Sequence, residues 1–151
     1  MPSEQDLGPR LSTRLTYLLK RALLELDALH EERLAPHGIG ARELGVLLLL
    51  DAREPESQQQ TAQRLGVDRT TMVALIDALE SKGLVARRPD AQDRRRNVIE
   101  LTNAGRKTLR QATRASDQAE QRLLAELDET EAAQLRGLLR RIAIPRADQQ
   151  R

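Results

Sequence analysis

The most informative stretch of this chain, residues 61–102, reads TAQRLGVDRTTMVALIDALESKGLVARRPDAQDRRRNVIELT. Just before it, Ser57 and Gln60 have the Ser-x-x-Gln spacing of a capping box, in which each side chain bonds the backbone amide of the other residue. A helix is therefore predicted from just after Ser57 to Gly66, because glycine readily adopts the left-handed conformation that ends helices. Asp68 then predicts the start of a second helix, since its carboxylate accepts backbone N–H groups and suits the positive end of the helix dipole.

The second predicted helix has one apolar and one polar side. Its large apolar residues between Met72 and Leu79 recur at the i, i+3, i+4, i+7 spacing of a single buried stripe. Gly83 is expected to end this helix. The residues off the stripe are short or polar, as a face that approaches the wall of a groove should be: Arg69, Thr70, Thr71, Ala74 and Asp77.

Two short segments of alternating residues follow the second helix. Residues 84–88 and 97–101 predict two strands, and the loop Pro89-Asp90-Ala91-Gln92-Asp93-Arg94-Arg95-Arg96 joins them. Two helices around a glycine turn, followed by a hairpin, make a winged helix-turn-helix, which places one helix against nucleic acid. We therefore predict a mainly α (α+β) fold, with a DNA-binding lobe over residues 41–102 and a wing over residues 88–97.

Positive charge is concentrated on this hairpin rather than spread over the chain. The 151 residues include 25 lysines and arginines against 23 aspartates and glutamates, a net charge of +2. Between Arg87 and Arg96, however, arginines outnumber aspartates, and such a cluster can reach phosphates or a narrow minor groove. The alternative is a solvated loop in an arginine-rich chain, which a neighbouring helix-turn-helix makes less favoured.

The run from Asp68 to Gly105 resembles the DNA-binding lobe of the MarR family of bacterial transcriptional regulators. The wing of that family typically carries Asp-x-Arg, then a strand, then Leu-Thr-x-x-Gly. This chain has Asp93-Arg94-Arg95, followed by a strand and by Leu101-Thr102-Asn103-Ala104-Gly105. The resemblance extends over roughly residues 8–144, and these wing motifs are its most specific part.

The resemblance implies a role for each residue of the wing. In the family, the Asp of the motif braces the wing and the Arg two positions later enters the minor groove, which assigns these roles to Asp93 and Arg95. Arg94 and Arg96 lie outside the key position and are expected to contact phosphates. Arg69, Thr70 and Thr71 are expected to read base edges in the major groove. The complete set of predicted DNA contacts is Arg69, Thr70, Thr71, Ala74, Asp77, Arg88, Asp93, Arg94, Arg95 and Arg96.

Helical arms with apolar faces flank the lobe. The segment from Leu11 to Leu34 is predicted to be one helix with a broad leucine face that ends before Pro36. After Gly105, a long helix is expected to continue through Leu127. The capping box of Asp128-x-x-Glu131 then opens a last helix, which ends before Pro145.

These arms, residues 8–36 and 106–145, are predicted to pair with a second chain. Each arm is too apolar on one face to be a solvated helix, and the resemblance implies interlocked terminal helices in a two-fold dimer. A two-fold protein reads two half-sites about 34 Å apart, so an obligate homodimer on a pseudo-palindrome is expected. The alternative is that the arms fold back on their own lobe.

No motif for catalysis is found. The sequence contains no phosphate-cradling glycine loop and no Gly-x-Ser-x-Gly, and its two histidines, His30 and His37, lack the carboxylate spacing of a metal site. We therefore predict that the chain is not an enzyme and that it holds neither a metal nor a cofactor.

The resemblance also implies a small phenolic or aromatic effector bound between the arms and the lobe. The candidate contacts are Tyr17, His30, His37 and Arg42, together with residues around 44–48. Tyr17 is the single aromatic residue of the chain, and simple packing within the arm is the alternative reading for it.

Length and composition favour one domain over residues 1–151 in the cytoplasm. No run approaches the roughly 20 apolar residues of a membrane span, no signal-peptide order is seen at the start, and there are no cysteines.

The favoured function is that of a transcriptional regulator that binds specific sequences of double-stranded DNA, a repressor that a ligand releases. The alternatives are a winged-helix module that binds proteins, or an architectural DNA-binding protein of weak specificity.

Overall fold

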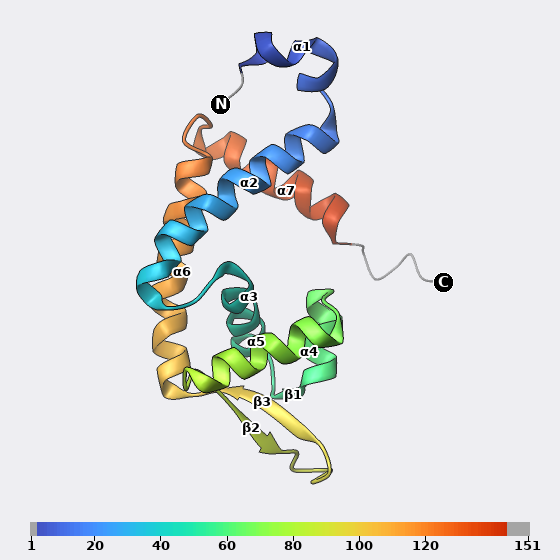
Figure 1. The fold of residues 1–151 in the computed structure, drawn as a ribbon, viewed down its shortest axis with the longest axis vertical. Coiled ribbons are helices and arrows are strands. Elements are labelled where there is room, and N and C mark those ends of the chain that lie inside the picture. The colour runs from blue at the N-terminus through green and yellow to red at the C-terminus, as the bar shows by residue number, and fades with distance from the viewer. Residues whose placement is uncertain (1–2, 145–151) are drawn as a thin grey trace, which may run out of the picture.

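The computed structural model describes residues 3–144, and Figure 1 shows a lobe of helices and a small sheet below a group of long helices. The elements in chain order are α1 (Glu4–Ser12), α2 (Leu15–Leu34), the short 3-10 helix η1 (Ala35–His37), α3 (Ala41–Asp51), β1 (Glu56–Ser57), α4 (Gln58–Leu65), α5 (Arg69–Ser81), β2 (Val85–Pro89), β3 (Asn97–Leu101), α6 (Asn103–Leu123) and α7 (Glu129–Ala143).

Helices α4 and α5 form the predicted helix-turn-helix. The capping box is complete, because the Gln60 amide donates to the Ser57 hydroxyl and the Ser57 amide donates to the Gln60 side chain. Gly66 ends α4 with a φ of 64°. Asp68 caps α5 as predicted. Met72, Ile76 and Leu79 on α5 are fully buried, and they pack in one core with apolar residues of α3 and β3.

The sheet is antiparallel, with strand order β1-β3-β2. Val85 pairs with Leu101 at the base of the wing and Pro89 pairs with Asn97 near its tip. β2 begins one residue later than predicted, since Leu84 lies in the turn, where its carbonyl accepts the Thr102 amide. β1 was not predicted, because two residues are too short to show alternation.

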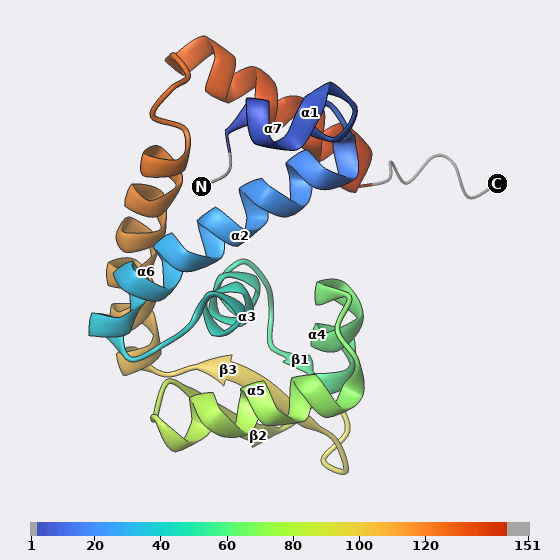
Figure 2. The same ribbon diagram turned by 45° about the horizontal axis from the view of Figure 1, so that its top comes forward.

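Above the lobe, α2 and α6 lie side by side and α7 returns across their far ends (Figures 1 and 2). Side-chain hydrogen bonds join the pair: His30 Nε2 lies 2.9 Å from the Ser116 hydroxyl, and Arg33 donates to Gln118 over 3.1 Å. The capping box of Asp128 opens α7 as predicted. None of the helices in the described part of the chain combines the length and hydropathy of a membrane span.

Three predictions about the arms were wrong in detail. Residues 11–34 are not one helix, because Arg14 adopts extended backbone (φ −75°, ψ 125°) and separates α1 from α2. Helix α6 begins at Asn103 rather than after Gly105, since the Thr102 hydroxyl caps it. Leu127 lies in the turn after α6. Pro145, expected after the last helix, lies outside the described residues.

Candidate nucleic-acid interface

The start of α5 is an ordered, exposed surface. Asp68 Oδ1 accepts the backbone N–H of Thr71 over 2.8 Å, and Asp68 Oδ2 accepts the Thr71 hydroxyl over 2.7 Å. These two bonds, the backbone bond first, lower the pKa of Asp68 below its ordinary value, since they favour the charged carboxylate. The charged carboxylate therefore caps the N-terminus of α5 and places its negative charge at the positive end of the helix dipole.

The predicted reading face of α5 is divided in the structure. Arg69, Thr70 and Ala74 are exposed, as a face that enters a groove requires. Thr71 is half-buried and its hydroxyl proton is already used in the cap, so it can offer a base edge only an acceptor or its methyl group.

Asp77, predicted to lie on the groove-facing side of α5, is exposed and pairs with an arginine of the wing. Its carboxylate accepts a hydrogen bond from Arg87 of β2 over 2.5 Å, and Glu80 accepts a second one from the same guanidinium over 2.6 Å. The sequence placed Asp77 on the groove-facing side by helical periodicity alone. Periodicity assigns a residue to a face of its helix but does not identify a cation on the following strand.

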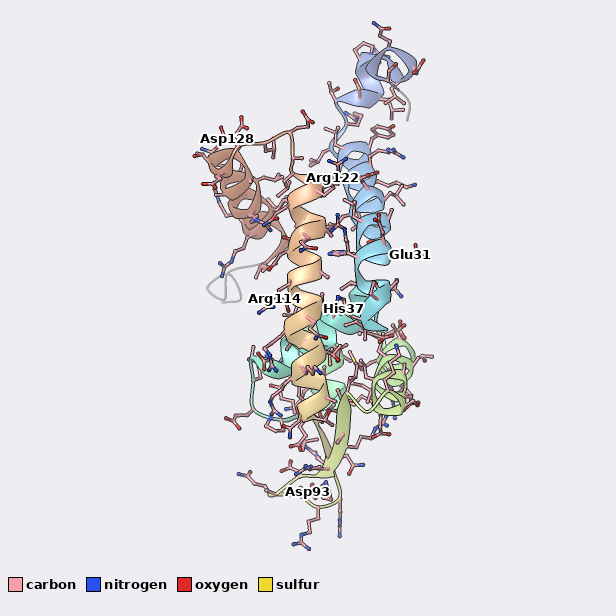
Figure 3. The ribbon with its side chains drawn as sticks, turned by 90° about the vertical axis from the view of Figure 1, so that its left-hand side faces the viewer. Glu31, His37, Asp93, Arg114, Arg122 and Asp128 are labelled. Atoms are coloured by element: carbon pink, nitrogen blue, oxygen red, sulfur yellow. The ribbon has the colours of Figure 1, made fainter. Side chains whose placement is uncertain are left out.

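The tip of the wing is a tight turn built on two aspartates. Asp93 Oδ1 accepts the backbone N–H of Arg95 over 3.1 Å, and the Asp93 carbonyl accepts the N–H of Arg96 over 2.9 Å. Asp90 bonds across the turn, from its N–H to the Arg96 carbonyl. Asp93 lies at the end of the molecule farthest from Asp128 of the α7 cap (Figure 3). The carboxylate of Asp93 thus braces the backbone that carries Arg95.

The five hairpin arginines are not equivalent. Arg87 is neutralised by α5, Arg88 pairs with Glu100 over 2.6 Å, and Arg96 lies 3.6 Å from Asp93. Within residues 3–144, no acid lies within ion-pairing distance of Arg94 or Arg95. The uncompensated positive charge of the wing is therefore at its tip.

A polar cleft of about 730 Å³, absent from the sequence prediction, lies between the two predicted contact elements. It is bordered by Arg69 at the start of α5, by Arg96 and Asn97 of the wing, and by glutamines of α4. Gln59 and Gln63 lie on the exposed side of α4, and a row of glutamines on one short helix is the signal in the sequence that could have predicted this cleft.

A second, apolar groove of about 980 Å³ lies among the arms. It is bordered by leucines of α2, by the end of α6 and by one face of α7. Several of these side chains are largely exposed in the single chain, including Leu23 and Ile142. A third cleft, of about 490 Å³, lies between α3 and α6.

The four candidate effector contacts do not all lie together in one chain. Tyr17 and His30 both lie on α2 and are 13 residues apart, which corresponds to about 20 Å along a helix. His37 ends η1 and Arg42 lies in the first turn of α3. His30 bonds to Ser116 on α6. Among the described residues, these four side chains border neither the polar cleft, nor the apolar groove, nor the cleft between α3 and α6.

Comparison with solved structures identifies this arrangement. The crystal structure of a MarR-family transcriptional regulator from Rhodococcus sp. RHA1 superposes with a TM-score of 0.83 at 31% identity. The match covers 92% of this chain and 100% of that one. The chain belongs to the MarR family. The model of the MarR family matches residues 39–96, which contain the helix-turn-helix, β2 and the wing tip as far as Arg96.

Two further solved structures are of CouR, which the first of them describes as a transcriptional repressor. One is bound to a 23-mer DNA duplex and matches with a TM-score of 0.84 at 35% identity, over 95% of this chain and 99% of that one. The other, from Rhodococcus jostii RHA1, is bound to p-coumaroyl-CoA and matches with a TM-score of 0.80 at 32% identity, over 92% of this chain and 98% of that one.

The chain spans between 59% and 64% of the length of the curated relatives that it matches. MarR-family membership places this chain among transcriptional regulators and not among enzymes, as predicted.

Proposed function

We propose that this chain is a sequence-specific transcriptional regulator that binds double-stranded DNA as a homodimer on a pseudo-palindromic operator. It acts as a repressor that a small molecule releases. A regulator of this kind works where the chromosome lies, so its location is the cytoplasm. CouR, which is similar over most of both chains, carries the name of a transcriptional repressor and binds a DNA duplex.

The observation that carries this proposal is the state of Arg95. Its backbone is held by Asp93, and its guanidinium has no acidic partner within the described residues, at the tip of a two-stranded ribbon. An arginine presented in this way suits the narrow minor groove, whose negative potential attracts it. Arg69 and Thr70, exposed at the start of α5, then face the adjacent major groove.

The proposed homodimer is supported by the groove among the arms. Single exposed leucines are ordinary on protein surfaces, but a contiguous apolar groove indicates an interaction site. The exposed leucines continue on both α2 and α7, so a second copy can cover them with the same faces. A two-fold axis through the arms presents two copies of α5 to successive major grooves, as a pseudo-palindromic operator requires.

The proposed effector is a small aromatic or phenolic compound held between the arms and the lobe. His30, His37 and Arg42 lie near this junction, whereas Tyr17 can join them only across a dimer. CouR binds p-coumaroyl-CoA, a phenolic thioester. A decisive probe is p-coumaroyl-CoA, with free p-coumarate as a second probe, added to the preformed protein–DNA complex; release of DNA by either one supports this effector class.

The DNA-binding proposal is tested by replacing hairpin arginines one at a time. Arg95→Ala should weaken operator binding by about 1–3 kcal/mol without lowering the melting temperature. Arg88→Ala is the matched comparison, since Arg88 is also exposed on the hairpin but pairs with Glu100, so its loss should be smaller. Equal affinities for wild type and Arg95→Ala would overturn the assignment of the wing.

A further inference from the structure

Arg87 is the one hairpin arginine that is directed into the lobe. It lies on β2, with 26% of its side chain exposed. One terminal nitrogen donates to Glu80 over 2.6 Å; the other donates to Asp77 over 2.5 Å and to Gln58 over 3.3 Å. A single guanidinium therefore joins the first strand of the wing to α5 and to the first residue of α4.

Because of these contacts, Arg87 is not one of the side chains that we expect to bind DNA directly. Both of its terminal nitrogens already donate to side chains of the lobe, and two carboxylates offset its charge. The hydrogen bond to Asp77, followed by the influence of Glu80, raises the pKa of Arg87 above its ordinary value, so the guanidinium remains charged over the whole physiological range. By contrast, Arg94 and Arg95 at the tip have no acidic partner among residues 3–144.

The wing needs such an anchor for a physical reason. A two-stranded hairpin is at best marginally stable in water, and beyond β1 the wing has no third strand to support it. Asp77 and Glu80 are three residues apart and so lie on one face of α5, toward β2. Figure 2 shows α5 running along the side of the β2–β3 ribbon. A planar fork that bonds both carboxylates fixes this spacing better than a point charge would.

We propose that Arg87 is a positioning residue that holds the wing at a fixed distance and angle from α5, so that Arg95 and the start of α5 enter neighbouring grooves together. The inference rests on the proposed DNA-binding function. Its energetic basis is preorganisation, because a wing that is already fixed loses less freedom when DNA binds. Asp77 and Glu80 thereby contribute to DNA binding although they carry the charge that phosphates repel.

Removal of Asp77 and Glu80 should change the DNA affinity in opposite directions under this inference and under simple electrostatics. Removing negative charge from a DNA-binding lobe should by itself tighten binding. If Arg87 is positioned by these acids, the double variant Asp77→Ala/Glu80→Ala should instead bind DNA about tenfold more weakly. The matched control is Glu54→Ala, which removes an exposed acid from the loop before β1 and should bind as tightly as wild type or slightly more tightly.

The conservative variant Arg87→Lys supplies the second comparison. It keeps the charge but cannot present two nitrogens to two carboxylates, so its affinity should lie between those of wild type and Arg87→Ala. Affinities are measured by fluorescence anisotropy at one salt concentration, with circular dichroism to confirm the folded fraction. Wild-type or tighter binding by the double variant overturns the inference while leaving DNA binding itself intact.

Hydrogen exchange of the free protein tests the anchoring of the wing without DNA. The Arg96 amide, which bonds to the Asp93 carbonyl at the wing tip, should exchange its hydrogen about tenfold faster in the double variant than in wild type. Its exchange in Glu54→Ala should be unchanged. Unchanged exchange in the double variant contradicts the inference even if wild type binds no DNA, an outcome that would separately refute the proposed function.

Discussion

Gly105 lies in the first turn of α6, where the absence of a side chain allows α6 to pack closely against the backbone at the base of the wing. The residue is buried, and a Cβ at this position would overlap the carbonyl oxygen of Leu84 and press on Leu101. That carbonyl already accepts the Thr102 amide, so the backbone has no room to move away. The glycine of the Leu-Thr-x-x-Gly motif is thus explained by close approach of two backbone segments rather than by a turn.

Gly105→Ala should therefore destabilise the fold by about 1–3 kcal/mol or more, since overpacking against backbone cannot relax. Denaturant unfolding measures the change. Gly45→Ala is the control, because Gly45 also lies in a helix but a Cβ at its position would meet open space. Alanine there should be neutral or stabilise by up to about 1 kcal/mol. Destabilisation of Gly45→Ala as large as that of Gly105→Ala would contradict the explanation by contact with Leu84.

The cap of α5 should make stability depend on acid pH. The pKa of Asp68 is lowered in the folded chain, so its contribution is fully present above the ordinary value of 3.8 and is lost as pH falls through the folded value. Asp68→Asn still accepts the Thr71 amide but does not titrate in this range. Melting temperatures measured from pH 7 to pH 3 should fall more steeply for wild type than for Asp68→Asn. Parallel curves would contradict this role of the Asp68 carboxylate.

At the scale of elements, the sequence predicted the helix ends that depend on interactions between residues close together in the chain. The capping boxes at Ser57 and Asp128, the Asp68 cap and the φ of Gly66 were all readable, because each depends on residues within four positions along the chain. The Asp77–Arg87 pair was missed because its partners are ten residues apart on different elements. The break at Arg14 was also missed, since no glycine or proline stands at that position.

The apolar groove between α2 and α7 offers a test on a single helix. Leu23 borders the groove and is 58% exposed, whereas Leu24, its neighbour on α2, is 49% exposed and does not border it. Leu23→Glu should prevent two chains from associating, because it places a charge in the apolar contact. Leu24→Glu should leave association unchanged.

Light scattering after size exclusion measures this association. Wild type and Leu24→Glu should show about twice the chain mass of 17.0 kDa, and Leu23→Glu should show a single-chain mass or loss of cooperative unfolding. A Leu23→Glu protein with wild-type mass and stability would remove the groove from the proposed interface. A folded wild-type monomer at micromolar concentration would refute the dimer itself.

At the scale of the whole molecule, the sequence predicted long helices on both sides of the winged helix-turn-helix, but it did not predict where the effector residues would lie. The lobe is defined by consecutive motifs, and its core forms largely within one stretch of chain. Tyr17, His30, His37 and Arg42 were chosen because of a family resemblance, and a single chain spreads them from one end of α2 to the start of α3. Sites assembled from distant segments, or from two chains, leave no periodic signal in one sequence.

The central claim, recognition of a specific DNA sequence, is tested most directly by fluorescence anisotropy. Wild-type protein is titrated onto duplexes from its own upstream intergenic region and onto a scrambled duplex, both at about 150 mM salt, since affinities depend strongly on salt. We expect nanomolar binding to a site in that region, with a preference of about 10³ or more over the scramble. Equal, micromolar binding to both duplexes, or binding to neither, would contradict the claim.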